Sequence, residues 1–130
     1  MFAYCIPYTF SEMLYDISKL PSDVAKHHVF GRSLAGIDIP ILHITNHSVQ
    51  KKKKNIFVTG RIHPAESNSS YVLKGFLEFL CSNNKYAQEM RKRVNFLVIP
   101  MINPDGVIIG NSRTSAAGRD MNRMFLDTDQ

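Results

Sequence analysis

The pattern in which apolar residues recur along the chain predicts where its helices and strands lie. Residues 67–81 carry apolar side chains at every third or fourth position, which is typical of a helix with one buried face. A second helix is expected over residues 10–20. Thr9 and Glu12 have the spacing of a capping box at its start, and Pro21 marks its end.

Four short segments rich in β-branched and aromatic residues predict strands. They cover residues 29–33, 37–45, 56–59 and 94–100. Ala35 and Gly36 fit a turn between the first two strands, and Pro40 indicates an edge strand or a bulge. The last two segments are apolar almost throughout, as expected of strands that are buried on both faces of a parallel sheet.

The order strand, helix, strand over residues 56–100 predicts a βαβ unit with a right-handed crossover. The sequence therefore indicates an α/β fold, with a mixed, largely parallel sheet and flanking helices. A chain of 130 residues is long enough for one compact domain with a modest core.

Composition bears on the cellular location more than on the fold. The chain is 44% hydrophobic and 21% charged, as soluble globular proteins are. No apolar run is long enough to span a membrane, and the amino-terminal residues lack the features of a secretory signal. Cys5 and Cys81 alone make no disulfide framework. We expect a cytoplasmic protein with no membrane partner.

The chain is basic, with a formal net charge of +5 and an isoelectric point of about 9.4. Such a balance fits a nucleic acid, an anionic membrane or an acidic substrate. The densest basic run is the four lysines at 51–54, which lie between two predicted strands and are interpreted as a solvated turn. Because the basic residues carry no nucleic-acid-binding signature, we expect no nucleic-acid partner.

Polar residues of the kinds used in catalysis follow the last two predicted strands. They are His63, Glu66, Asn103, Asp105, Arg113, Asp120, Asn122 and Arg123. Ligands of α/β sheets bind in crevices at the carboxyl ends of the strands, so we expect these side chains to gather in one place. Residues 103–106 (NPDG) are interpreted as a tight turn that directs the following loop into this crevice.

His63 and Glu66 have the spacing of a zinc-binding pair. An imidazole and a carboxylate at the end of a strand can face one metal ion, and catalytic zinc sites commonly use two histidines and one glutamate. The pair is a weak signal by itself. A surface or capping histidine, followed by an acid at a helix start, explains the same two residues without a metal.

Four later residues add groups that suit peptide hydrolysis. Asp120 has the chemistry to hold the second ring nitrogen of His63, and Arg113 has the chemistry to stabilise a developing oxyanion. Asn122 and Arg123 offer an amide and a guanidinium fork to a carboxylate. Each of these residues, taken alone, is also compatible with an ordinary cap or a solvated surface position.

Together these residues resemble the M14 zinc carboxypeptidases, and most closely the cytosolic carboxypeptidases that remove glutamate from tubulin tails. The resemblance rests on residues 60–68 (GRIHPAESN), 74–77 (KGFL), 99–111 (IPMINPDGVIIGN), 113 and 118–123 (GRDMNR), and on residues 2–9 (FAYCIPYT). These motifs follow one another in the family's order over nearly the whole chain, so the resemblance is far more specific than the His/Glu pair.

The resemblance implies Zn²⁺ as the cofactor and a role for each residue of the cluster. It assigns His63 and Glu66 to the metal, Asp120 to support of His63, Arg113 to the scissile carbonyl, and Asn122 and Arg123 to the terminal carboxylate of the substrate. The implied activity is removal of C-terminal residues, in particular glutamates of acidic tails such as those of tubulin. The chain departs from the subfamily at Ala65, where glycine is usual.

The family's third zinc ligand is a histidine well downstream, and its general-base glutamate lies later still. None of His27, His28, His43 and His47 takes that place. We therefore expect residues 1–130 to be the N-terminal portion of a carboxypeptidase domain, without the β-rich domain that precedes it in the subfamily. We expect this portion alone to be inactive, because two protein ligands hold zinc weakly and no base is left to activate water.

Two other readings of the sequence stay open. Aspartoacylases and succinylglutamate desuccinylases also combine an early His/Glu pair with a later Asp-x-Asn-Arg motif, and they act on acylated amino acids. The other reading is a non-catalytic remnant that binds acidic tails without cleaving them.

Overall fold

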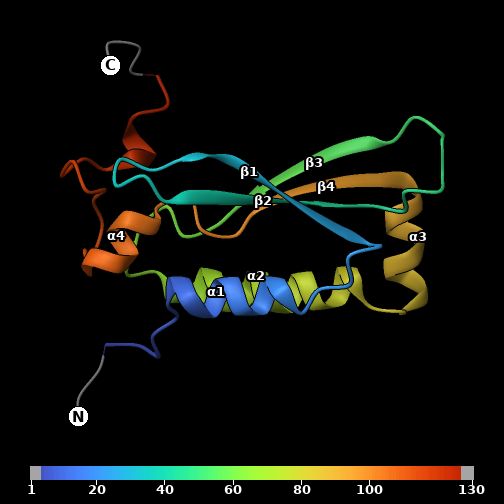
Figure 1. Ribbon diagram of the computed structural model, residues 1–130, viewed down its shortest axis with the longest axis horizontal. Coiled ribbons are helices and arrows are strands. Elements are labelled where there is room, and N and C mark those ends of the chain that lie inside the picture. The colour runs from blue at the N-terminus through green and yellow to red at the C-terminus, as the bar shows by residue number, and fades with distance from the viewer. Residues whose placement is uncertain (1–3, 127–130) are drawn as a thin grey trace.

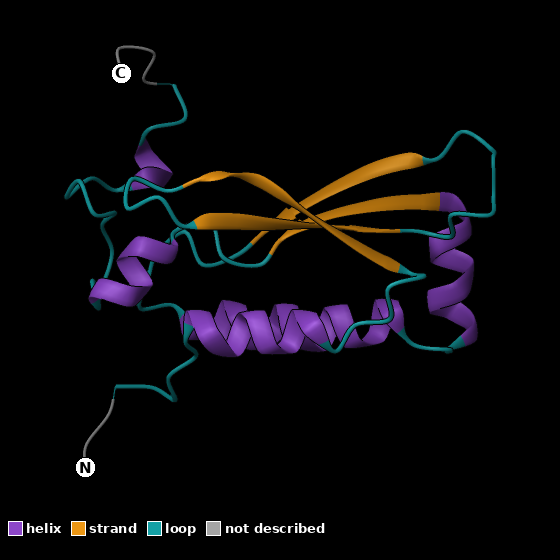
Figure 2. Ribbon diagram, in the orientation of Figure 1, coloured by secondary structure: helices purple, strands orange, loops and turns teal. Residues whose placement is uncertain are grey.

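The computed structural model describes residues 4–126 and has one four-stranded mixed sheet with helices beside it (Figures 1 and 2). In chain order the elements are α1 (Phe10–Ser18), β1 (Ala25–Arg32), β2 (Asp38–Ile44), β3 (Lys54–Thr59), α2 (Ser67–Cys81), α3 (Lys85–Arg93), β4 (Val94–Ile99), α4 (Pro104–Ile109) and the 3₁₀ turn η1 (Met121–Arg123). The predicted α/β class with a mixed sheet is confirmed.

The strand order in the sheet is β1-β2-β4-β3. β3 and β4 pair in parallel from Lys54 opposite Val94 to Thr59 opposite Ile99, as a strand–helix–strand unit requires. The β1–β2 and β2–β4 pairs are antiparallel, so the sheet among the described residues is not largely parallel. For β1 and β2 the physical reason is their short connection, which can only join antiparallel neighbours.

The β1–β2 hairpin closes through Gly36, whose φ of 79° lies in the left-handed region that glycine favours. β1 begins four residues before the predicted strand, because Ala25 and the polar residues after it pair with β2. Val29 pairs with Pro40, and the register of the β1–β2 ladder shifts directly after this pair, between Val29 and Gly31. Pro40 thus marks a bulge in the ladder, as predicted, within an inner strand.

The hydrophobic core lies between one face of the sheet and the helices α1 and α2, which run side by side beneath it (Figure 1). Phe96 and Val98 of the inner strand β4 point into this core. The expectation that residues 56–59 are buried on both faces is wrong. Ile56 is 43% and Phe57 is 55% exposed, because β3 is an edge strand of the described sheet and no described helix covers its second face.

Helix α1 begins with the predicted capping box. The Thr9 side chain accepts from the Glu12 backbone, and the Glu12 carboxylate accepts from the Thr9 backbone at 2.6 Å. Asp16 then joins α1 to its surroundings, because it accepts from Tyr8 Oη at 2.7 Å and pairs with Lys74 of α2 at 3.0 Å. Burial raises the pKa of Asp16, but these hydrogen bonds outweigh it and leave the pKa below its usual value.

Helix α3 was not expected from the sequence, because its pattern is dominated by charged residues. It crosses the end of the sheet where β3 and β4 begin (Figure 1). Arg91 is buried there and donates to the backbone carbonyls of Leu80 and Ser82. Within residues 4–126 we find no helix with the length and apolar character needed to cross a membrane.

Candidate metal centre

The chain leaves β3 at Thr59 and reaches α2 through a compact loop, residues 60–66. Gly60 starts this loop where a side chain would not fit, since a Cβ there would lie 2.3 Å from Leu73 Cδ1 and 3.0 Å from Pro100 O. Arg61 follows with a φ of 56°, in the left-handed region. These constraints place His63 in the loop, 6% exposed, and Glu66 at the N-cap of α2.

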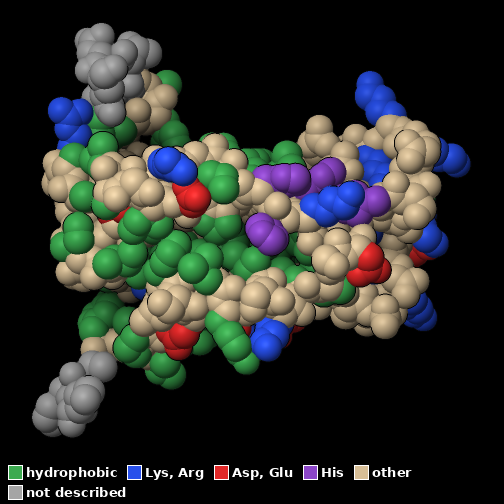
Figure 3. Space-filling model, in the orientation of Figure 1, with side chains coloured by type: hydrophobic (Ala, Val, Ile, Leu, Met, Phe, Trp, Pro, Cys, Tyr) green, Lys and Arg blue, Asp and Glu red, His purple; other side chains and the backbone are tan. Residues whose placement is uncertain are grey.

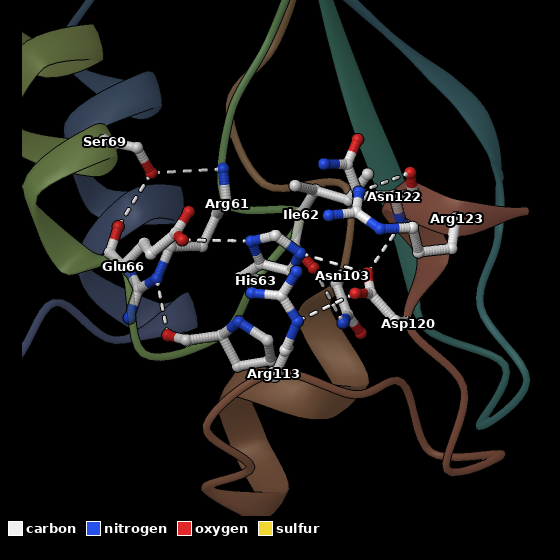
Figure 4. A network of polar contacts seen from close by, with 11 residues as sticks. Arg61, Ile62, His63, Glu66, Ser69, Asn103, Arg113, Asp120, Asn122 and Arg123 are labelled. Atoms are coloured by element: carbon white, nitrogen blue, oxygen red, sulfur yellow. Dashed lines mark hydrogen bonds and ion pairs between the residues drawn. The ribbon is translucent and has the colours of Figure 1, made fainter. Parts of the chain in front are cut away.

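His63 lies between two carboxylates (Figure 4). Its Nδ1 is 3.0 Å from Glu66 Oε1, and its Nε2 is 3.0 Å from Asp120 Oδ1. If the Nε2 proton is donated to Asp120, the Nδ1 lone pair faces an acceptor oxygen of Glu66. Two acceptors at this distance need a proton or a cation between them, so a metal ion is one species that would satisfy the Glu66 side of the ring.

The donor set fits a zinc ion. Nitrogen and oxygen ligands lie about 2.0–2.2 Å from zinc, so two ligands of a tetrahedral ion are about 3.3 Å apart. The observed 3.0 Å between His63 Nδ1 and Glu66 Oε1 is close to that separation. The pair supplies two ligands only, and the described part of the chain contains no cluster of three His, Cys, Asp or Glu side chains that would hold a metal.

Asp120 joins His63 to the last segment of the described chain. It accepts from His63 through Oδ1, from Arg113 Nε through Oδ2 at 2.8 Å, and from the Asn122 backbone at 3.0 Å. Partial burial raises the pKa of Asp120, but these three hydrogen bonds outweigh it and hold the pKa below its usual value. Asp120 is therefore an ionised acceptor that fixes the orientation of the imidazole.

Arg113, Asn122 and Arg123 border the same network (Figure 4). Arg113 is about half exposed and commits its Nε to Asp120, while a guanidinium carries four further N–H donors. Asn122 and Arg123 lie on η1 with their side chains exposed, and Arg123 Nη1 donates to the Asn122 carbonyl at 3.2 Å. The structure thus brings together His63, Glu66, Asp120 and Arg113, with the other two next to them.

Residues 103–106 were interpreted as a tight turn, and this is wrong. Asn103 caps α4, accepting from the Gly106 backbone at 3.1 Å, and Pro104 occupies the first turn of that helix, where its missing N–H costs nothing. Asn103 also donates to the carbonyl of Ile62 at 3.1 Å. α4 therefore supports the loop that carries His63.

Sequence reasoning missed the structural roles of two residues that build this loop. Arg61 is buried behind it, and Asn103 holds Ile62 in place. Nothing in the sequence distinguishes a buried arginine from a solvated one, whereas an Asn before Pro is a signal for a helix cap. Ala65 has an ordinary backbone conformation, since Arg61 is the one non-glycine residue with positive φ among residues 4–126. Alanine is thus tolerated where glycine is usual.

An α/β domain with a His/Glu pair at the carboxyl end of a strand, backed by a carboxylate on the second imidazole nitrogen, has the arrangement that zinc enzymes use. The family model described as zinc carboxypeptidase (Peptidase M14) matches residues 10–130. The chain therefore belongs to the zinc carboxypeptidase family, as the motifs predicted.

Curated relatives and solved structures agree with this membership. The chain is 47% identical over 133 residues to cytosolic carboxypeptidase 2 of Xenopus tropicalis, and 44% identical over 131 residues to cytosolic carboxypeptidase 6 of Caenorhabditis elegans. Among solved structures, it superposes on a metallo-carboxypeptidase from Burkholderia cenocepacia with a TM-score of 0.85 at 28% identity.

The alignments cover most of this chain but a small part of its relatives. They include 95% of the chain in all three cases. The chain spans 14% of the Xenopus relative, 28% of the Caenorhabditis relative and 34% of the solved Burkholderia chain.

Proposed function

We propose that this chain contributes zinc ligands and substrate-binding residues to a zinc-dependent metallocarboxypeptidase that acts in the cytoplasm. The observation that carries the proposal is the position of His63 between Glu66 and Asp120, at 3.0 Å from each. Membership of the zinc carboxypeptidase family supports the chemistry. The names of the curated relatives, which call them cytosolic, support the location.

In this proposal His63 and Glu66 bind the metal through Nδ1 and Oε1, and Asp120 holds the Nε2 proton of His63. A zinc ion held there would supply Lewis acidity for polarising a carbonyl and activating water. Asp120 makes the imidazole a better donor to the metal and keeps it from rotating. Because Asp120 also accepts from Arg113 and the Asn122 backbone, the orientation is set from three directions.

The arginines give the proposed site its preference for a free C-terminus. The exposed guanidinium of Arg123, with the Asn122 amide beside it, would bind a terminal carboxylate by two parallel hydrogen bonds. Arg113 would act on the carbonyl of the bond that is broken, since its Nε is anchored by Asp120, which also contacts His63.

We further propose acidic protein tails as substrates, with removal of glutamates such as those of tubulin. The charge of the chain supports this, because the net value of +5 favours anionic partners. Basic side chains gather at the end of the molecule where α3 lies (Figure 3). Residues 51–54, Lys92 and Arg93 line a hollow of about 620 Å³ there, at the ends of β3 and β4 that lie away from His63.

We propose that these 130 residues are the N-terminal portion of the carboxypeptidase domain. The coverage of about a third of the solved Burkholderia chain supports their being a portion of such a domain. The portion alone is expected to bind zinc weakly and to leave peptides intact, because His63 and Glu66 are two ligands where catalytic sites use three. Peptide hydrolysis by the purified chain that disappears in Glu66→Ala would contradict this expectation.

The experiment that tests the function is a pair of binding measurements on the 130-residue chain. Zinc is titrated against a chromophoric chelator with wild type, His63→Ala and Glu66→Ala. An acidic peptide ending in glutamate is then compared with the same peptide carrying a C-terminal amide, with wild type and Arg123→Ala. We expect both metal variants to lose zinc binding, and wild type to bind the free carboxylate roughly tenfold better than the amide, which is about 1.4 kcal/mol.

Each outcome decides between the readings. Loss of the carboxylate preference in Arg123→Ala supports the carboxypeptidase. Equal affinity of wild type for both peptides rules out the proposed binding of the terminal carboxylate. If N-acyl amino acids bind to the site and the peptides do not, the acylase class is favoured. A third outcome is peptide binding that depends on neither zinc nor the terminal carboxylate and that weakens on charge reversal of Lys51 and Lys52. This outcome favours a non-catalytic module that binds acidic tails.

A further inference from the structure

Arg61 is a buried guanidinium that carries a positive charge into the interior, with 6% of the residue exposed. Its three side-chain hydrogen bonds go to neutral oxygens. Nε donates to Pro64 O at 2.8 Å, and Nη1 donates to Tyr8 O at 3.0 Å and to Ser70 Oγ at 2.9 Å. Burying a charge in this way is costly, and a residue that only filled space would not need it.

The three acceptors of Arg61 belong to three different parts of the chain. Pro64 is inside the loop that carries His63, Ser70 is in the first turn of α2, and Tyr8 is in the segment before α1. The Arg61 backbone N–H also donates to Ser69 Oγ at 3.2 Å, and its φ of 56° turns the chain sharply at this point (Figure 4). One side chain thus fixes both ends of the loop and the segment behind it.

The segment before α1 is held against α2 by independent contacts. Tyr71 Oη donates to the carbonyl of Pro7 at 2.8 Å, and Ser67 Oγ lies 3.2 Å from Cys5 Sγ. The rings of Tyr8 and Tyr71 meet edge to face at 5.3 Å between centroids. The segment before α1 is therefore held in a fixed position, and Arg61 connects this segment to the loop that carries His63.

We propose that Arg61 is the positioning residue of the metal loop, setting the angle between His63 and Glu66 by tying Pro64 to the first turn of α2 and to Tyr8. The proposal rests on the proposed function, since His63 and Glu66 matter together only if they share a metal. Arginine suits this task because its planar fork directs several donors at once along fixed directions. Lysine has a single nitrogen on a flexible stem and cannot reach three acceptors with the same geometry.

The chain provides a matched control in Arg91. This arginine is 7% exposed, and it also donates to backbone carbonyls, those of Leu80 and Ser82. It lies at the α3 end of the molecule, away from His63 (Figure 1). Arg61→Ala and Arg91→Ala therefore remove comparable buried groups, and a general loss of stability affects both variants alike.

The test uses the 130-residue chain as wild type, Arg61→Ala, Arg61→Lys and Arg91→Ala, with three readouts. Thermal unfolding measures stability. Long-range ¹H–¹⁵N spectra of the imidazole of His63, assigned with His63→Gln, report its tautomer and rotation without any metal. Zinc titration against a chelator reports affinity. We expect Arg61→Ala to lose the fixed His63 signal and about ten- to a hundredfold in zinc affinity, as for residues that support metal ligands.

We expect Arg61→Lys to recover only part of these losses, and Arg91→Ala to lower the unfolding temperature while leaving both His63 readouts as in wild type. If folded Arg61→Ala keeps the wild-type His63 signal, the inference is wrong, even if zinc binding by wild type upholds the proposed function. Zinc binding by wild type that His63→Ala and Glu66→Ala leave unchanged would contradict the proposed function, and the imidazole spectra still decide whether Arg61 positions His63. Should Arg61→Ala not fold, Ser70→Ala provides the same comparison with one of the three acceptors removed.

Discussion

At the scale of single residues, Asp120 connects three parts of the site, because its carboxylate accepts hydrogen bonds from His63, Arg113 and the Asn122 backbone. We expect Asp120→Asn to lower zinc affinity by about ten- to a hundredfold, since a neutral amide stabilises the metal-bound imidazole less than a carboxylate does. Zinc titration against a chelator measures the change.

Asp38→Asn is the control for this substitution, because Asp38 pairs with Arg32 at 2.7 Å on the exposed hairpin. We expect its zinc affinity to equal that of wild type. An Asp120→Asn variant that binds zinc as tightly as Asp38→Asn would show that Asp120 does not support His63.

The two cysteines differ in their surroundings, and this difference is also measurable. Burial raises the pKa of the Cys81 thiol to about 11, and the nearby Arg91 offsets this only in part. Cys5 is exposed. Because the thiolate is the reactive form, iodoacetamide at pH 8 is expected to modify Cys5 quickly and Cys81 only after unfolding.

Mass spectrometry of the modified chain over time checks this, and equal rates at the two thiols would contradict the burial of Cys81.

The raised pKa of Cys81 also makes the stability of the fold depend on pH. The unfolded thiol ionises first, so the contribution of Cys81 to the free energy of unfolding is complete below the ordinary thiol pKa and is lost as the pH rises toward 11.

At the scale of elements, the short helix α4 reaches the His63 loop through Gly106. A Cβ at Gly106 would lie 2.5 Å from Pro64 Cγ and 2.8 Å from Thr114 O. Gly106→Ala therefore has to push the loop away from α4, and we expect it to destabilise the fold by about 1–3 kcal/mol. Zinc binding should weaken as well, because Pro64 follows His63 directly.

Gly75→Ala is the matched change in α2, where a Cβ would meet nothing within 4 Å. There alanine should stabilise the helix by about 0.5–1 kcal/mol, because it restricts the unfolded chain more than glycine does. Urea unfolding of both variants measures these opposite signs. Destabilisation of equal size in both would show that the contact between α4 and Pro64 is unimportant.

The sequence allowed helices α1 and α2 and the succession of the four strands along the chain to be predicted, because these depend on local periodicity and caps. Helix α2 has the bounds that its pattern predicted, and the Thr9 capping box is present. The exposure of Phe57 was not predictable, since it depends on which strand occupies the sheet edge. Family motifs pointed to His63 and Asp120, whereas the role of Arg61 depends in part on a contact with Tyr8, 53 residues away, that no pattern encodes.

At the scale of the whole molecule, the helices α1 and α2 cover one face of the sheet and leave the other face without a helix among the described residues (Figure 1). Phe30 and Phe57 are 54% and 55% exposed on that side, with ring centroids 6.5 Å apart. Exposed apolar clusters on a sheet promote association.

We expect the isolated 130-residue chain to self-associate with increasing concentration, and Phe57→Lys to shift the dissociation constant upward by roughly tenfold, because a lysine must be desolvated in the contact. Sedimentation equilibrium measures this shift. Tyr86→Lys is the control, because Tyr86 is 64% exposed on α3. A monomeric wild type at all concentrations, or the same shift in both variants, would contradict the prediction.

The contacts of the metal loop also have a consequence for biosynthesis. His63 meets Asp120 only after 57 further residues have been added, which takes about 3–11 s at translation rates of about 5–20 residues per second. Until then the nascent chain has Glu66 but lacks the group that orients the imidazole. The nascent chain therefore lacks the contact that orients His63 for a metal ion. We expect metal binding at His63 and Glu66 to follow synthesis of the segment that contains Asp120.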